Sequence, residues 1–189
     1  MTLYLEDLPV GSVLTSEPRL ISAQDIADYC DLSGDHNPLH KDDDWVRENT
    51  PFEQRIAHGL LVLGVSSGST CTEMDALKII AYLSESREFT APTYPGESVV
   101  TTWTITENRP SASKPDRGIL RMDVACAKGD GTVVQRGEDV LLVARRGDTN
   151  SLRSSCHPRR ITRWRACPPG PCRPRRARPA AARCRPSCR

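Results

Sequence analysis

The sequence predicts an α+β fold, because helix-like patterns occupy its first half and strand-like patterns its second half. Apolar residues recur with helical spacing between residues 22 and 32, and residues 60–65 are apolar apart from one glycine. From residue 77 onward, apolar and polar residues alternate in long segments that turn residues separate. This order is typical of helices packed against an antiparallel sheet.

The first half begins with an extended segment over residues 3–20, with a turn at residues 9–12. Ser22 is expected to cap the first helix, and Gly34 to end it. The residues with the spacing of a buried stripe on this helix are Ile26, Tyr29 and Cys30. A short helical turn is expected over residues 42–47, with Trp45 as a packing anchor.

Residues 59–70 are apolar or small on all sides, which predicts a buried central helix. Four strands should follow, and together they should form an antiparallel meander. They are expected at residues 77–90, 99–105, 120–126 and 133–145.

The charge distribution divides the 189 residues into two parts. Residues 1–146 contain 14 basic and 23 acidic residues, a net charge of −9, whereas residues 147–189 contain 12 arginines and one acid, a net charge of +11. The second part also holds seven of the 15 prolines and five of the eight cysteines. We therefore expect one domain over residues 1–146 and a disordered tail over residues 147–189. We expect no specific nucleic-acid partner for this basic tail.

The composition also bears on the compartment. Residues 1–20 contain three acids and no apolar run, and no stretch approaches the ~20 apolar residues of a membrane span. The three cysteines of the domain are widely spaced, as expected of buried thiols in a reducing compartment. We therefore expect a cytoplasmic protein without a membrane anchor.

A polar loop at residues 33–40 brings Asp35 and His40 within five positions on backbone that cannot be regular helix. Pro38 removes an amide donor, and Gly34 allows a sharp turn. A carboxylate and an imidazole that share one water form a minimal acid–base device. The alternative is a loop whose Asp and Asn side chains only stabilise turns.

Metal binding is the less favoured interpretation of the histidines. His36 and His40 have the i, i+4 spacing of helical ligands, but Pro38 interrupts any helix between them. The tail cysteines at 167 and 172 and at 184 and 188 lack the flanking pattern of a zinc module. We expect no metal in either place.

Three segments of the domain together resemble the MaoC-like, or hydratase-2, branch of the hot-dog superfamily. They are residues 33–40 (SGDHNPLH), 56–61 (IAHGLL) and 89–99 (FTAPTYPGESV). Asp42 and Trp45 also follow the family pattern, whereas Val46 stands where a small residue is usual. The resemblance covers the acidic domain and none of the tail.

The resemblance implies a hot-dog fold, in which an antiparallel sheet wraps around a central helix, and a homodimer. It also implies reversible hydration of trans-2-enoyl thioesters of CoA or acyl carrier protein to (R)-3-hydroxyacyl thioesters, without a cofactor. Asp35 and His40 would be the catalytic pair. The Gly59 amide would receive the thioester oxygen, and Ser67 would contact the substrate unless it is only a small packing residue.

Other residues receive supporting roles. Asn37 would orient the loop, and His58 would form hydrogen bonds near the helix start. Lys114 and Arg117, with Arg109, lie in one loop that could hold the phosphates of CoA, or that could be a solvated hairpin.

Two other functions remain open. A hot-dog thioesterase usually carries an acid on the central helix, and residues 59–70 contain none. A non-catalytic subunit that binds acyl thioesters would be expected to have lost Asp35 or His40, and both are present.

Overall fold

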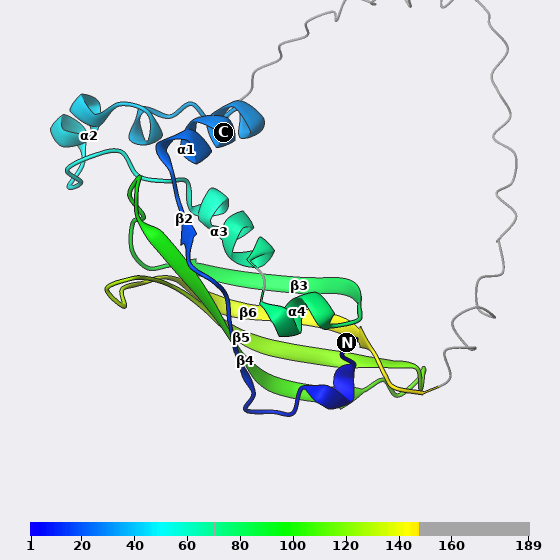
Figure 1. Cartoon of the computed structure of the whole chain (residues 1–189). Helices are drawn as coiled ribbons and strands as arrows, with labels where there is room; N and C mark the ends of the chain where they lie inside the picture. Colours follow the sequence, from blue (N-terminus) through cyan, green and yellow to red (C-terminus); the bar gives the residue numbers. More distant parts are fainter. Residues whose placement is uncertain (70, 148–189) are drawn as a thin grey trace, which may run out of the picture. The chain divides into compact units, whose positions relative to one another are not determined.

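The computed structural model describes residues 1–69 and 71–147, which form a curved antiparallel sheet with helix α3 against one face (Figure 1). Across the sheet the strands follow the order β1-β4-β5-β6-β3, and β2 also pairs with β4. The elements in chain order are η1 (Leu5–Asp7), β1 (Val13–Thr15), β2 (Arg19–Leu20), α1 (Ala23–Ser33), η2 (Pro38–His40), α2 (Asp43–Asn49), α3 (Gly59–Gly68), α4 (Thr72–Ala76), β3 (Ile79–Phe89), β4 (Ser98–Pro110), β5 (Arg117–Lys128) and β6 (Val133–Ala144).

The four predicted strands are confirmed, but only three of them form a meander. Strands β4, β5 and β6 pair in sequence, whereas β3 pairs with β6 at the far edge. The connection over residues 90–97 is too long for a tight hairpin and contains two prolines, which suits a crossing from one edge toward the other. Two register shifts interrupt the β3–β6 ladder near Ala81 and Ser84.

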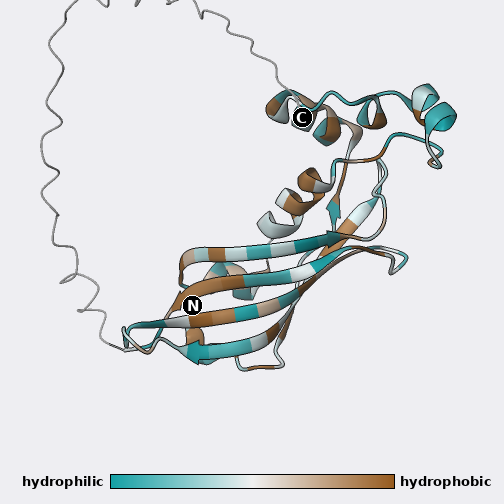
Figure 2. Ribbon diagram, turned by 180° about the vertical axis from the view of Figure 1, so that it is seen from behind, coloured by the Kyte–Doolittle hydropathy of each residue, from teal (hydrophilic) through white to brown (hydrophobic). Residues whose placement is uncertain are grey.

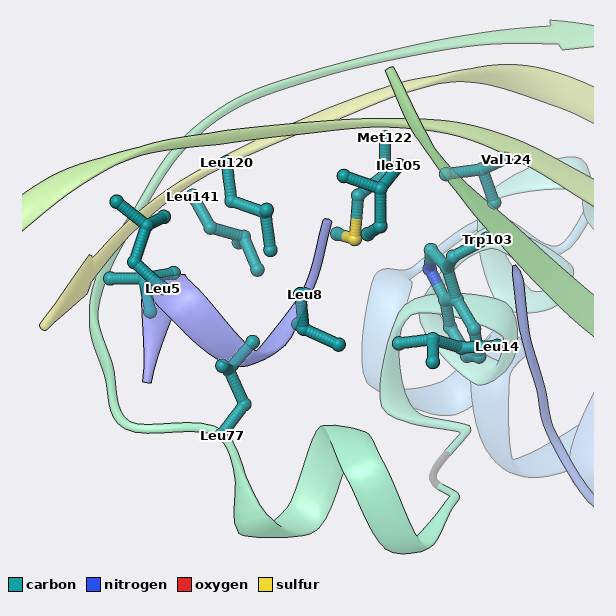
Figure 3. Close-up of a cluster of buried hydrophobic side chains, with 11 residues drawn as sticks. Leu5, Leu8, Leu14, Leu77, Trp103, Ile105, Leu120, Met122, Val124 and Leu141 are labelled. Atoms are coloured by element: carbon teal, nitrogen blue, oxygen red, sulfur yellow. The ribbon is translucent and has the colours of Figure 1, made fainter. Parts of the chain in front are cut away.

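Two clusters of buried side chains hold the sheet to the elements above it. The larger cluster lies beneath the N-terminal segment, where Leu5 and Leu8 face side chains from β4, β5 and β6 (Figure 3). The smaller cluster joins Ile21 and Ile26 to Val62 of α3 and Val99 of β4. Burying one such side chain contributes about 1.5–3 kcal/mol.

Local signals at α1 behave as predicted. The Ser22 hydroxyl accepts the Asp25 N–H at 3.0 Å, and the Asp25 carboxylate accepts the Ser22 N–H at 2.7 Å, a complete capping box. Ile26 and Cys30 are buried, whereas Tyr29, the third residue of the predicted stripe, is only half-buried. Gly34 ends the helix with φ +75°, a conformation that favours glycine.

Helix α2 forms where a short helical turn was expected, and the Asp42 carboxylate caps it. The prediction for Trp45 is wrong, because 36% of this residue is exposed while its neighbour Val46 is fully buried. Adjacent helical positions differ by about 100° in direction, and the phase of α2 turns Val46 inward.

Helix α3 is buried on one side only, in contrast to the prediction of burial all round. Val62 and Ser66 are buried, whereas Leu60 is 59% exposed. Figure 2 shows the apolar character of α3 and the alternation of apolar and polar residues along the strands. The sheet covers one side of the helix, and the opposite side stays open in a single chain.

A buried ion pair ties the edge strand to its neighbour. Arg87 of β3 donates to the Asp139 carboxylate of β6 at 2.6 Å, and both side chains are 2% exposed. The Trp103 indole N–H donates to the same carboxylate at 3.3 Å. Such a pair is costly to break from one side, because the remaining charge stays buried.

No helix in the described ranges is long and apolar enough to cross a membrane. The predicted tail begins at residue 147 and otherwise lies outside the described residues, as do its cysteine pairs. The domain boundary at residue 146 stays a prediction.

Candidate active site

The loop between α1 and α2 is built from side chains that hydrogen-bond to nearby backbone. The Asp35 carboxylate accepts the Asn37 N–H at 3.1 Å, and the Asn37 side-chain oxygen accepts the Leu39 N–H at 3.0 Å. The second bond caps η2, which begins with Pro38. These consecutive turns fix the path from Asp35 to His40, which agrees with the orienting role expected of Asn37.

His40 is held in a defined tautomer. Its Nδ1 lies 2.8 Å from the main-chain oxygen of Ile56, which can only accept, so Nδ1 carries the proton and Nε2 keeps its lone pair. A ring nitrogen of His40 and a carboxylate oxygen of Asp35 lie within 4.8 Å of each other. One water with ordinary hydrogen bonds and a tetrahedral angle spans about 4.6 Å. The two groups can therefore share a water.

His58 lies directly behind this pair, at the N-cap of α3. Its ring is 4% exposed and stacks on His40, with centroids 3.6 Å apart and planes 25° apart. Its Nε2 lies 3.3 Å from the Asp35 main-chain oxygen. Burial lowers the pKa of His58, and the charge of His40 acts in the same direction, against opposing contributions from Asp35. His58 is therefore neutral near neutral pH.

The three side chains Asp35, His40 and His58 are close enough for a metal site. The lone pair of an imidazole nitrogen lies in the ring plane. Because the two rings are stacked, their lone pairs run side by side and do not converge on one ion. This geometry does not favour a metal, although it brings together the groups that the sequence singled out.

A pocket of about 610 Å³ opens beside His40, within the size range of small-molecule sites. Gly59 and Leu60 of α3 line one part, and Phe89 and Gln135 of β3 and β6 line another. The lining is mainly apolar, so it suits an acyl group better than a polar ligand.

A separate hollow of about 550 Å³ lies at Thr102, Asp123 and Arg136. These positions alternate with buried residues along β4, β5 and β6, so the hollow is on the other face of the sheet. It has no part in the site at His40.

Gly59 is enclosed by two residues that sequence reasoning did not assign to the site. A Cβ atom at Gly59 would stand 2.8 Å from ring atoms of Phe89. The Gln135 amide donates to the Gly59 main-chain oxygen at 2.7 Å, and Gln135 is opposite Phe89 in the sheet. The sequence gives no signal for Gln135, because it begins a polar run from Gln135 to Asp139 and its neighbour Val134 is buried as well.

Three predicted site residues do not join this group within one chain. Ser67 lies two turns beyond Gly59, about 12 Å along α3, and its hydroxyl is 3.5 Å from the Glu85 carboxylate. Lys114 and Arg117 are near the β4–β5 turn. Arg117 is nine positions along β5, about 30 Å, from Cys126, the neighbour of Gln135.

Arg117 is also engaged locally. It pairs with Asp116 at 2.7 Å and thereby lowers the pKa of that carboxyl group. Within one chain, Lys114 and Arg117 therefore lie at the end of the sheet away from His40, because antiparallel strands carry their turn to the opposite end. Their role as CoA contacts stays a prediction.

Comparison with known proteins agrees with the geometry. A sequence profile of the MaoC like domain matches residues 6–123. A 3-hydroxybutyryl-CoA dehydratase from Methylorubrum extorquens is 32% identical over 152 residues, which cover 79% of this chain and 90% of that protein. An (R)-specific enoyl-CoA hydratase from Rhodospirillum rubrum is 33% identical over 144 residues, 76% of this chain and 94% of that protein.

The structural comparison concerns the fold. A Mycobacterium tuberculosis protein with a double hot-dog fold superposes with a TM-score of 0.67 at 18% identity, over 78% of this chain and 46% of that chain. An antiparallel sheet with a helix against its face is the arrangement that the hot-dog resemblance implied. On the profile match, the two relatives and this fold, the chain belongs to the MaoC-like dehydratase family.

Proposed function

We propose that the chain is a hydro-lyase that reversibly hydrates trans-2-enoyl-CoA to (R)-3-hydroxyacyl-CoA. The observation that carries the proposal is the close approach of Asp35 and His40 beside an apolar pocket that begins at Gly59. The names of the two relatives support a thioester of CoA as substrate.

Hydration adds a hydroxyl group to C3 and a proton to C2 of the conjugated thioester. Asp35 and His40 hold the water between them, with the free Nε2 of His40 as an acceptor. The proton removed as the oxygen bonds to C3 is returned to C2, so the pair ends the cycle unchanged. The reaction uses general acid–base chemistry and needs no cofactor.

Negative charge develops on the thioester oxygen during this addition. The Gly59 N–H belongs to the first turn of a ten-residue helix, whose leading N–H groups have no acceptor within the helix. A preorganised donor of this kind contributes about 10²–10³ in rate, roughly 3–4 kcal/mol, and the helix dipole adds to it.

We also propose that the working form is a homodimer. Strand β3 is at the edge of the sheet in the described part of the chain, and its exposed apolar residues are Ile79, Ile80, Tyr82, Leu83 and Phe89. Leu60 on the open side of α3 adds to this surface. A two-fold pairing of β3 edges would cover both features.

The decisive experiment follows crotonyl-CoA and longer enoyl-CoAs by loss of the conjugated double bond. Asp35→Ala and His40→Ala should each lower hydration by several orders of magnitude, and non-additively, because the two groups act as a unit. His36→Ala is the matched control, since His36 is exposed in the same loop. Either single variant with more than about a tenth of wild-type activity contradicts the assignment.

The same assay tests the thioesterase alternative. Hydrolysis releases a free CoA thiol, whereas hydration does not. Release of thiol at the rate of double-bond loss would replace the hydratase proposal. Resolution of the product by chiral chromatography tests the (R) configuration.

A further inference from the structure

His58 is the residue that touches both members of the proposed acid–base pair from behind. One face of its ring stacks on His40, and Tyr29 of α1 lies tilted at 4.9 Å between ring centroids. Its Nε2 lies 3.3 Å from the Asp35 main-chain oxygen and 3.9 Å from the Asp35 carboxylate. The next residue is Gly59, which lines the pocket beside His40.

The hydrogen bonds define how the His58 ring is protonated. The Asp35 carbonyl can only accept, so the Nε2 of His58 carries the proton. The Nδ1 atom is buried and has no partner among the described residues. A ring with one nitrogen donating to a carbonyl and the other without a partner has no route for passing protons onward.

His58 stays neutral although Asp35, one of the groups that face it, favours the charged form. The groups that face it are Asp35 from the loop, His40 from η2, and Tyr29 and Cys30 from α1, with the Cys30 sulfur 3.8 Å from Nε2. The nearest carboxylate, that of Asp35, is 51% exposed, and burial of the imidazole prevails. A neutral ring behind His40 carries no charge that would repel a proton on His40.

We infer that His58 is a positioning residue, which fixes the ring of His40 and the backbone of Asp35 at their common spacing while keeping its own proton. The inference rests on the proposed hydratase function. The same residue therefore aligns the acid–base pair and starts the helix whose first amide faces the thioester.

Three substitutions separate the two contacts of His58. His58→Phe keeps an aromatic face and removes the hydrogen bond, His58→Gln keeps a donor and removes the face, and His58→Leu removes both. We expect kcat to fall about 10²-fold in His58→Leu and about tenfold in the other two, with KM within about twofold. Met122→Ala, a core substitution remote from the site, controls for lost stability.

A second readout needs no substrate. The ¹⁵N shifts of His40 should show the Nδ1–H tautomer in the wild type and a mixture of tautomers in His58→Leu, because without the stacked ring His40 can turn away from the Ile56 carbonyl that holds its Nδ1 proton. If His58→Leu does not fold, His58→Phe and His58→Gln provide the same comparison with each other and with the wild type.

The outcomes distinguish this inference from the function on which it rests. A kcat within threefold of wild type in His58→Leu, or in both other variants, overturns the positioning role. A rise in KM that alone accounts for the loss of kcat/KM also overturns the positioning role. Unchanged His40 shifts in His58→Leu overturn it as well. A wild-type protein without hydratase activity overturns the proposed function, while the His40 shifts still decide whether His58 orders the ring.

Discussion

Replacement of Gly59 tests the proposed oxyanion site with a magnitude that follows from the structure. A Cβ atom there would stand 2.8 Å from two ring atoms of Phe89, whereas ordinary van der Waals contacts between carbon atoms begin at about 3.4 Å. The ring or the start of α3 must therefore move by about 0.6 Å. Since a misplacement of about 1 Å costs ~10²-fold, Gly59→Ala should lower kcat about 10- to 10²-fold and Gly59→Val about 10²- to 10³-fold.

The assay is the initial rate of crotonyl-CoA hydration, with kcat and KM determined separately. Gly129→Ala is the control, because a Cβ atom at Gly129 meets nothing within 4 Å. The double variant Gly59→Ala/Phe89→Ala removes the ring that the new methyl group contacts. It should recover most of the lost kcat, because Phe89 is 54% exposed and its removal leaves the sheet intact.

Two results would refute this reasoning. Normal kinetics in Gly59→Val would exclude the Gly59 amide as the donor to the thioester oxygen. A double variant as slow as Gly59→Ala would mean that the added carbon crowds the substrate directly and that contact with Phe89 is irrelevant.

Burial lowers the pKa of His58 in the folded chain. As the pH falls below about 6.5, the unfolded chain therefore binds a proton on this imidazole before the folded chain does, and the free energy of unfolding should fall. Denaturant titration should show a lower unfolding free energy at pH 5.5 than at pH 7.5, by at most about 1.4 kcal/mol per pH unit, with a smaller loss in His58→Gln. Arg87→Ala should cost about 3–5 kcal/mol by the same measurement, because it leaves Asp139 buried and unpaired; a cost below 1 kcal/mol contradicts this. Sedimentation at micromolar concentration should give twice the 20.9 kDa chain mass, and a monomer would exclude the β3 pairing. Deletion of residues 147–189 should leave folding and hydration nearly unchanged, and loss of activity would place the tail in the enzyme.

Features set by neighbouring residues could be predicted from the sequence. Ser22 and Asp42 cap helices, and Gly34 ends one, through bonds or dihedral angles that span at most four residues. The loop that carries Asp35 and His40 depends in the same way on short-range hydrogen bonds. These interactions form wherever the local residues occur in that order, so the pattern alone is informative.

The surroundings of Gly59 could not be predicted in this way. Phe89 and Gln135 reach it through the register between β3 and β6, and a shift of one residue in β3 would turn Phe89 to the other face. The two bulges in β3 change that register without a clear sequence signal. The position of Arg117 was predictable, because successive turns of an antiparallel sheet alternate between its two ends.

The pairing of β3 with β6 has a consequence for synthesis of the chain. The ribosome makes β3 first, and 43 residues separate Phe89 from Val133, where its partner strand begins. At roughly 5–20 residues per second, β3 waits about 2–9 s for that partner to be translated. During this interval its backbone has no partner strand on either side. A polypeptide released before residue 133 keeps β3 without its partner, and β6, the last strand of the described residues, is the one that secures it.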